Sequence, residues 1–443
     1  MLKTFKLGGV HPPENKLSAH KAIEAIEAPE KIFVPLGQNL GAPSVATVKR
    51  GDKVKTGQLI AKGEAFISAM IHSPVSGTVD KIDTHIDASG YRRDTIIITR
   101  EGDEWEEGID LSADLRKEIT LSPQEIVEKV KASGIVGLGG ATFPTHVKLM
   151  VPDGKKAEYL IINAVECEPY LTADHQLMLE KADEIVVGVQ ILMKAIGVDK
   201  AIIGIENNKP DAIEHMNKSV ANFAGITVQA LKVMYPQGAE KQLIKACVNR
   251  EVPSGKLPIE VGCVVQNVGT AFAVYEAVQK NKPLIERVVT VTGKNVSIPS
   301  NFMARIGTPV SLLIEKAGGI PEDNGKIING GPMMGKAINS TDVPVTKGTS
   351  GILLMSEKEA KRVREYNCVR CARCTTVCPM GLEPFLLGLA GESLDWEIAE
   401  KEQVMDCIEC GSCQYTCPSG RPLLDNIRLG KFKVGQIMRS RKN

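Results

Sequence analysis

Aromatic residues make up only 4% of this 443-residue sequence, and its formal net charge is only +1. Surfaces that bind nucleic acid combine basic charge with aromatic side chains, so these two shortages argue against nucleic-acid binding. The sequence also lacks any apolar run close to the roughly 20 residues that a membrane-spanning helix needs. We therefore expect no transmembrane segment of its own and no nucleic-acid partner.

The first sixteen residues contain no apolar core and no small-residue cleavage site, so we expect no secretory signal peptide. These features predict a chain on the cytoplasmic side of the membrane, where any membrane association would be peripheral or through a partner. The length is too great for one ordinary domain and predicts three or four.

Residues 1–115 read as short β segments separated by turn residues. Two stretches, Val48–Ile60 and Ile71–Val79, resemble the halves of the barrel-sandwich domain of biotinyl and lipoyl carriers. Those carriers present a modifiable lysine at the hairpin tip between the halves. The corresponding tip here, Gly63–Ser68, contains no lysine, so we expect a structural or docking module rather than a swinging arm.

Residues 116–285 alternate β-like apolar runs with amphipathic helical stretches, which predicts an α/β domain. A first helix should begin after Ser122, because Pro123 suits the first helical position and Glu125 completes a capping box. The expected strands are Tyr159–Ala164, Ala201–Ile205, Ile226–Val233 and Gly262–Gln266. The expected helices are Ala173–Ile196, Pro210–Ala224, Ala239–Asn249 and Thr270–Gln279.

The remaining sequence predicts three further parts. Residues 286–355 indicate a small β-grasp module, with a strand at Val288–Thr292 and a short helix at Val310–Ala317. Residues 356–430 open with a charged helix and contain most of the cysteines, and residues 431–443 read as a basic tail. The expected fold class is thus multidomain, α/β with α+β.

Eight of the eleven cysteines form two groups with the same spacing, C-x2-C-x2-C-x3-C-P. This spacing is that of bacterial two-cluster ferredoxins, in which the fourth cysteine of each run ligates the other cluster. It predicts two [4Fe–4S] clusters with crossed ligand sets. One set is Cys368, Cys371, Cys374 and Cys417; the other is Cys407, Cys410, Cys413 and Cys378.

The alternative is a pair of zinc sites, but zinc sites favour two separated C-x2-C pairs over three successive cysteines before a Cys-Pro. The other cysteines, Cys167, Cys247 and Cys263, should be reduced and buried. Because Cys167 lies between two acidic residues, its pKa should be raised, which argues against a reactive thiolate.

A glycine-rich stretch runs from Gly134 to Lys148 and contains Gly137, Gly139 and Gly140. Backbone N–H groups of such a turn can surround a phosphate, and Lys148 adds a positive charge. The stretch follows a helix rather than a strand, so it does not fit the dinucleotide fingerprint. A tight turn with left-handed glycines and no ligand remains an equal alternative on this motif alone.

Three further motifs accompany the glycine-rich stretch: Tyr159-Leu-Ile-Ile-Asn163-Ala-Val-Glu166-Cys-Glu168-Pro169, Tyr235-Pro-Gln-Gly238-Ala-Glu240, and Val264-Val-Gln-Asn267-Val-Gly269-Thr270. Together they resemble the flavin- and NADH-binding subunit of respiratory complex I and related hydrogenase diaphorases. The whole chain, with its opening Gly8-Gly9-Val10-His11-Pro12-Pro13, is similar to the C subunit of Rnf-type ion-translocating electron transport complexes.

The resemblance implies an FMN site surrounded by Gly137, Gly139, Gly140 and Lys148. It implies that Asn163 and Glu166 hydrogen-bond the flavin, and that Asn267 and Thr270 reach its phosphate or ribityl chain. Phe143, Glu168 and Glu240 would line the NAD(H) site, with Phe143 facing the adenine. Hydride transfer is flavin chemistry, so no separate catalytic side chain is expected.

Two positions depart from the complex I pattern. Leu138 stands where that family has an arginine, and Val165 stands where it has an aspartate. The first change affects the expected nucleotide affinity, and the second removes one expected flavin contact.

The resemblance implies a peripheral subunit at the cytoplasmic face of the membrane. It would exchange hydride between NAD(H) and FMN and relay single electrons through the clusters to partner subunits, with ferredoxin reached through a neighbouring subunit. Two alternatives are a soluble diaphorase subunit of a hydrogenase-like enzyme and a relay subunit that binds no nucleotide. The basic tail could meet acidic lipid or an acidic ferredoxin.

Overall fold

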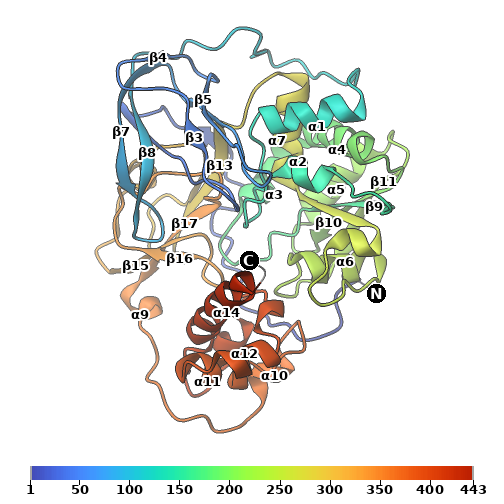
Figure 1. The fold of residues 1–443 in the computed structure, drawn as a ribbon, viewed down its shortest axis with the longest axis vertical. Coiled ribbons are helices and arrows are strands. Elements are labelled where there is room, and N and C mark those ends of the chain that lie inside the picture. The colour runs from blue at the N-terminus through green and yellow to red at the C-terminus, as the bar shows by residue number, and fades with distance from the viewer. Residues whose placement is uncertain (1, 442–443) are drawn as a thin grey trace.

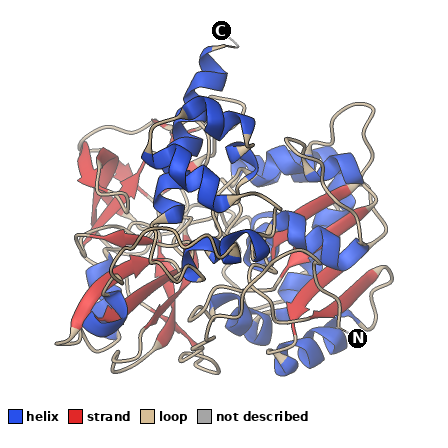
Figure 2. Cartoon of the chain, turned by 90° about the horizontal axis from the view of Figure 1, so that it is seen from below, coloured by secondary structure: helices blue, strands red, loops and turns tan. Residues whose placement is uncertain are grey.

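The chain folds into a barrel-like β part, a central α/β part, a second sheet and a C-terminal helical part (Figure 1). The structure is a computed structural model that describes residues 2–441. Seen from below, the strands lie in two groups, with the C-terminal helices between them in this view (Figure 2). The expected fold class is confirmed.

The β part consists of two small sheets that face each other. The first has the order β2-β8-β7-β4 and the second the order β3-β5-β6. Their core is built from alternating apolar residues such as Ile32, Val34, Ile96 and Ile98. The strands are β2 (Lys31–Pro35), β3 (Val45–Ala46), β4 (Lys53–Val54), β5 (Leu59–Lys62), β6 (Ile71–His72), β7 (Gly77–Ile86) and β8 (Arg92–Arg100).

Residues 3–25 do not belong to this barrel, although we expected one unit over 1–115. They form an extended segment, here called the N-terminal strap, that runs across the other parts of the molecule. Lys3 forms a bridge to Leu231 of the central sheet. Gly9 donates its N–H to the Val377 carbonyl at 2.9 Å. The strap ends in β1 (Ile23–Ala25), which pairs with β14 of the second sheet.

The central part contains a four-stranded, fully parallel sheet of order β11-β10-β9-β12. Its side chains alternate between two cores: Leu160 and Ile162 face one, and Ile161 faces the other. Helices α4, α5 and α7 cover the first face and α6 covers the second. The strands are β9 (Tyr159–Asn163), β10 (Ala201–Glu206), β11 (Ile226–Leu231) and β12 (Cys263–Asn267).

The helices of this part follow the sequence prediction closely. The capping box at Ser122 and Glu125 is present at the start of α1. The single helix expected over Ala173–Ile196 is divided at Lys181, whose φ of −130° and ψ of 29° are not helical. The helices are α1 (Pro123–Ala132), α2 (Thr145–Leu149), α3 (Ala173–Glu180), α4 (Ala182–Ile196), α5 (Pro210–Val220), α6 (Glu240–Val248), η1 (Pro258–Val261) and α7 (Val268–Gln279).

The second sheet is mixed, with the order β1-β14-β13-β17-β15-β16, and α8 (Val310–Lys316) packs on its core. Its strands from the β-grasp region are β13 (Glu286–Thr292), β14 (Ser300–Arg305), β15 (Asn324–Asn329), β16 (Lys336–Ile338) and β17 (Gly351–Ser356). The strap thus supplies the edge strand of a sheet whose other strands lie far along the chain.

The C-terminal part is helical. The charged helix expected after residue 356 is only the short α9, and the chain to residue 372 has no regular structure. The helices are α9 (Glu357–Ala360), α10 (Arg373–Thr376), α11 (Pro384–Glu392), α12 (Trp396–Lys401), η2 (Val404–Asp406), α13 (Ser412–Tyr415) and α14 (Leu423–Ser440).

We expected a basic tail at residues 431–443, but residues 431–440 do not form a tail. These residues form the second half of α14, and Val434 is fully buried in the C-terminal core. The reason is the apolar stripe of the helix, which includes Leu423, Ile427 and Val434 and packs on α11. Lys442 and Asn443 lie outside the described residues.

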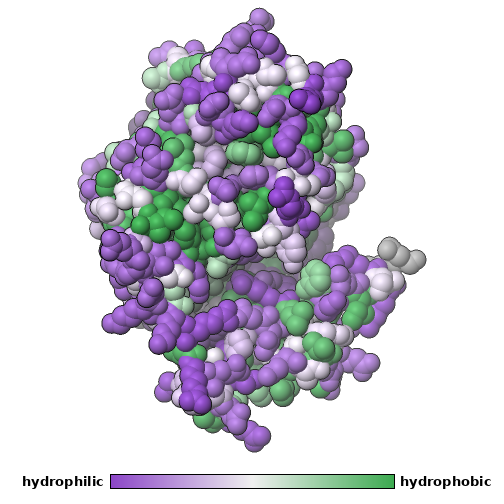
Figure 3. Space-filling model, turned by 90° about the vertical axis from the view of Figure 1, so that its left-hand side faces the viewer, coloured by the Kyte–Doolittle hydropathy of each residue, from purple (hydrophilic) through white to green (hydrophobic). Residues whose placement is uncertain are grey.

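Within residues 2–441, no helix is both long enough and apolar enough to cross a membrane. Hydrophilic side chains dominate the face that is turned left in Figure 1, and apolar side chains form separate patches on it (Figure 3).

Candidate functional site

The order of the parallel sheet locates a candidate site. β9 is the first strand of the sheet in chain order, and it lies between β10 and β12. The next two strands, β10 and β11, are added on one side of β9, and β12 is added on its other side. This is the topological switch point, outside which open α/β sheets bind their ligands at the carboxyl ends of the strands. Asn163 and Asn267 are the final residues of β9 and β12 and are register partners. Two predicted site residues thus meet at this point.

The glycine-rich loop is folded back on itself beside these strand ends. Gly137 donates its N–H to the Phe143 carbonyl at 2.9 Å, which closes the loop at its base. Gly139 lies so close to Asn267 that an added Cβ would be 3.1 Å from the asparagine side chain. Gly140 has open space around it, and residues 139–141 are exposed. The loop therefore presents backbone rather than side chains to a ligand at the switch point.

Thr270 and Asn267 hold this loop to the start of α7. The Thr270 hydroxyl accepts a hydrogen bond from the Leu138 N–H at 2.9 Å, and Thr270 is fully buried. The Asn267 side chain caps α7 by accepting from the N–H groups of Gly269 and Thr270. Its amide group donates to Asp174 at 2.7 Å. Burial, together with the nearby charge of Glu166, raises the Asp174 pKa to about 7.

A buried arginine lies beneath the loop. Arg287, on β13, donates to the carbonyl oxygen of Leu138 at 3.3 Å and also to that of Lys347. Burial lowers its pKa to about 10, while Asp174 favours its charged form. Leu138 is the position at which the complex I pattern has an arginine. In this chain, a guanidinium supplied by the second sheet lies under the same position.

The three polar residues after β9 have different surroundings. The Asn163 amide donates to the Gly238 carbonyl at 2.7 Å. The Glu166 carboxylate accepts from the N–H groups of Asp174 and His175, so it caps α3. The Glu168 carboxylate accepts from the N–H groups of Met333 and Met334, in the turn between β15 and β16 of the second sheet. Burial raises the Glu168 pKa to about 7. Asn163 is the member of this motif that lies at the strand end itself.

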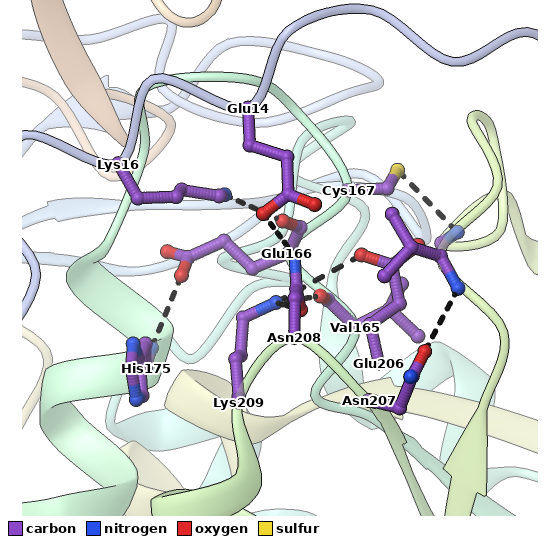
Figure 4. A network of polar contacts seen from close by, with 12 residues as sticks. Glu14, Lys16, Val165, Glu166, Cys167, His175, Glu206, Asn207, Asn208 and Lys209 are labelled. Carbon is purple, nitrogen blue, oxygen red and sulfur yellow. Dashed lines mark hydrogen bonds and ion pairs between the residues drawn. The ribbon is translucent and has the colours of Figure 1, made fainter.

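A partly buried lysine, Lys16, and a buried one, Lys209, support the turn after β9 (Figure 4). Lys16, from the strap, donates to the carbonyl oxygens of Glu166, Glu168 and Leu171 at 2.6–2.9 Å. Lys209 donates to the Val165 carbonyl at 2.8 Å. Burial and the nearby charge of Lys209 lower the pKa of Lys16.

Glu206 is an acidic residue beside these two lysines, and its carboxylate lies 3.8 Å from the Lys209 ammonium. Burial raises the Glu206 pKa to about 7, although Lys209 opposes the shift. The pKa of Cys167 in the same network is raised by burial and by the nearby charges of Glu206 and Glu168, as expected from the sequence.

Lys148 and Glu240 form an ion pair at 2.7 Å. Lys148 also donates to the Val265 carbonyl at 3.2 Å. Both side chains are partly exposed. A basic and an acidic group are therefore available together at the rim of the switch point.

The second predicted cluster set is brought together. Cys407, Cys410 and Cys413 line one cavity together with Cys378 from the first cysteine group. This is the crossed set expected from the spacing. No three His, Cys, Asp or Glu side chains between residues 2 and 441 are arranged to bind a single metal ion.

The first set is more open. Cys368 and Cys371 are exposed, while Cys374 and Cys417 are partly buried in the C-terminal core. The two cysteine loops nevertheless have the same left-handed backbone conformation at corresponding positions of their motifs. Arg370 and Ala372 have left-handed φ values of 54° and 57°, and Glu409 and Gly411 have values of 57° and 79°. Such turns point successive N–H groups inward, as iron–sulfur sites require. The residues therefore fit a cluster in each loop.

The second set directly contacts the α/β part. The Tyr235 hydroxyl donates to the Cys410 carbonyl at 2.7 Å, and Tyr235 is buried. Gln242 donates to the Pro379 carbonyl at 3.0 Å. The Met333 carbonyl would lie 2.9 Å from a Cβ at Gly411. The motif that begins at Tyr235 was visible in the sequence, but the role of its tyrosine was not.

Other functional residues had no sequence signal. Lys16, Lys209 and Arg287 stand alone in their segments, and only the fold makes them neighbours of the site.

Four family models match the chain in the order of its parts. The RnfC barrel sandwich hybrid domain matches residues 3–103, and the Nuo51 FMN-binding domain matches residues 130–276. The SLBB domain matches residues 288–337, and the 4Fe-4S dicluster domain matches residues 360–418. These matches confirm an FMN-binding domain and a two-cluster domain.

The chain is similar to curated proteins over nearly its whole length. It is 48% identical to the C subunit of the proton-translocating ferredoxin:NAD(+) oxidoreductase complex of Clostridium ljungdahlii, over 91% of this chain and 87% of that protein. It is 43% identical to the C subunit of the Na(+)-translocating ferredoxin:NAD(+) oxidoreductase complex of Acetobacterium woodii, over 97% of each.

A solved structure of an NAD+-reducing [NiFe]-hydrogenase in the H2-reduced state shares the fold, with a TM-score of 0.50 and 19% identity. The likeness covers 72% of this chain and 63% of that chain. The family models and the close relatives together identify the chain as a member of the C-subunit family of ion-translocating ferredoxin:NAD(+) oxidoreductase complexes.

Proposed function

We propose that this protein exchanges hydride between NAD(H) and FMN at the switch point of its parallel sheet and relays single electrons through two [4Fe–4S] clusters. The observation that carries the proposal is the meeting of Asn163, Asn267 and the glycine-rich loop at the carboxyl ends of β9 and β12. Bound FMN supplies the conversion between two-electron and one-electron chemistry, and the protein supplies orientation and electrostatics.

The residues divide into contact and positioning roles. Gly137, Gly139, Gly140, Lys148 and Asn163 have backbone or side-chain atoms at the open rim, and we assign them to FMN. Phe143 and Glu240 border the same rim and are assigned to NAD(H). The positioning residues, which act through hydrogen bonds within the protein, are Glu166, Glu168, Asn267 and Thr270.

Electrons should pass first to the cluster of Cys378, Cys407, Cys410 and Cys413. Its loop contacts Tyr235, and the same motif continues to Gly238, which bonds Asn163 at the flavin site. The cluster of Cys368, Cys371, Cys374 and Cys417 would then be the outer one. The exposure of Cys368 and Cys371 supports its exchange of electrons with a partner.

The partners we propose are the other subunits of a membrane-bound complex, with ferredoxin reached through a neighbouring subunit. The protein would be peripheral and on the cytoplasmic face. The family assignment supports this placement, and so does the exchange of electrons through an exposed loop.

Anaerobic purification followed by flavin, iron and sulfide analysis and an NADH titration tests the proposal. Two clusters correspond to about eight iron atoms. We expect about one FMN per chain and bleaching of the flavin on NADH addition. An iron-replete protein with no flavin and no response to NADH, even after FMN is added, would favour an electron relay that binds no nucleotide. Membrane association on native fractionation would separate the membrane-bound complex from a soluble diaphorase.

A further inference from the structure

The barrel reaches the glycine-rich loop through its hairpin tip, residues 63–68. The Leu40 N–H, on the segment beside this tip, donates to the Thr142 carbonyl at 3.1 Å. The segment that contains Leu40 is bonded in turn to the tip itself, because Ala42 donates its N–H to the Ile67 carbonyl. The barrel and the glycine-rich loop therefore lie side by side here, although about a hundred residues separate Leu40 from Thr142.

The hairpin tip is held firmly in this place. Ala42 donates its N–H to the Ile67 carbonyl at 3.0 Å, and Ser68 donates its hydroxyl to the Ala42 carbonyl at 3.0 Å. From below, the buried Lys347 ammonium donates to the carbonyls of Met70 and Gly134 at 2.6 and 2.7 Å. These bonds tie the barrel to the base of the glycine-rich loop, so the tip is a fixed wall of the site.

This fixed tip exposes apolar side chains. Phe66 is 66% exposed and Leu40 is 55% exposed. Phe66 belongs to the tip in which carrier domains have their modifiable lysine, but an aromatic side chain can carry no such group. A rigid, exposed aromatic ring beside a loop that can surround phosphate suits stacking on a planar heterocycle. Phe143, from the loop itself, lies on the neighbouring segment and is only partly exposed.

We propose that Phe66 of the barrel stacks on the adenine of the dinucleotide, so that the barrel completes the NAD(H) site. This inference rests on the proposed function. The nicotinamide end of the dinucleotide would meet the flavin at the strand ends, and its diphosphate would follow the glycine-rich loop toward the hairpin tip. The barrel then has a binding role in place of the carrier role that its missing lysine excludes.

The test is steady-state NADH oxidation with an artificial acceptor by wild type, Phe66→Ala and Phe66→Trp. Stacking of a base on an aromatic ring is worth roughly 1–3 kcal/mol, or about 5- to 150-fold in binding. We expect about a tenfold rise in the KM for NADH in Phe66→Ala with kcat retained. Phe66→Trp should restore the wild-type KM.

Reduced nicotinamide mononucleotide, which lacks adenine, separates stacking from a structural effect. Its KM should be the same in wild type and Phe66→Ala. The matched control is Tyr91→Ala, because Tyr91 lies on the same barrel and is 65% exposed, and it should leave both substrates unaffected.

An unchanged KM for NADH in Phe66→Ala, or equal rises for both substrates, would overturn the inference. Wild type that oxidises neither substrate would instead overturn the proposed function. FMN and iron contents equal to wild type would show that each variant is folded.

Discussion

The two cysteine loops have the same spacing and the same backbone but very different surroundings. The first exposes Cys368 and Cys371, whereas the second buries Cys410 against Tyr235 of the α/β part and Cys413 in the C-terminal core. Spacing and left-handed turn residues suffice to define a cluster site, so both loops carry one. The surroundings decide burial and hydrogen bonding, which set the potential of a cluster. Identical motifs should therefore have unequal roles in one electron path.

The largest expected effect comes from removing one ligand in each loop at the matching position. Cys410→Ala should lose the inner cluster and abolish reduction of the outer cluster by NADH, because the path from the flavin site passes Tyr235 and Cys410. Cys371→Ala should lose the outer cluster and leave NADH reduction of the inner one intact. Anaerobic EPR after NADH addition measures both.

Dithionite provides the control for these two variants, because it should reduce whichever cluster remains in either variant. If NADH still reduced the outer cluster in Cys410→Ala, the proposed order of electron transfer through the two clusters would be wrong.

A smaller effect should follow loss of the hydrogen bond that only the second loop makes. Tyr235→Phe leaves the buried Cys410 carbonyl without its donor, which should cost roughly 1–2 kcal/mol of stability. Tyr415→Phe is the matched control, because the exposed Tyr415 lies in the same loop region and should change stability by less than about 0.5 kcal/mol. Urea unfolding followed through cluster absorbance measures the difference. Equal effects of the two variants would show that the Tyr235 contact adds nothing.

The smallest expected effect is a dependence of protein stability on pH, and it again involves only the second cysteine loop. The Glu168 carboxyl bonds the segment that touches Gly411, and burial raises its pKa from 4.5 to about 7. The folded protein therefore binds this proton more tightly than the unfolded chain. The contribution of Glu168 to the stability of the folded protein is therefore fully present below pH 4.5 and is lost as the pH rises to about 7.

Glu168→Gln should flatten this part of the pH dependence, and thermal unfolding across the same range measures it. Glu64→Gln, at an exposed position, should reproduce the wild-type profile. If the stability of Glu168→Gln depended on pH as that of wild type does, Glu168 would not be the group responsible for this pH dependence.

The sequence predicted well the features that depend on local patterns. The strands of the central sheet and the capping box at Ser122 both rest on spacing within short segments. The basic tail was misjudged, because charged residues hid the apolar stripe that buries Val434.

Contacts between distant segments could not be predicted. Lys16 and Arg287 act on turns more than a hundred residues away, and neither belongs to a motif. For the same reason the sequence placed Thr270 and Glu166 near the flavin but gave no sign that each is bonded to the protein's own backbone. A ligand site needs residues that contact the ligand and residues that support them, and a sequence motif does not show which of its members has which role.

The N-terminal strap has a consequence for biosynthesis. Its residues leave the ribosome before the segments that they bind, because Gly9 bonds Val377 and β1 pairs with β14. These binding sites do not exist until most of the chain has been translated, whereas domains generally fold one by one as they emerge. We therefore expect the strap to reach its native position only after the parts that it binds have folded, so that its binding joins domains that are already formed.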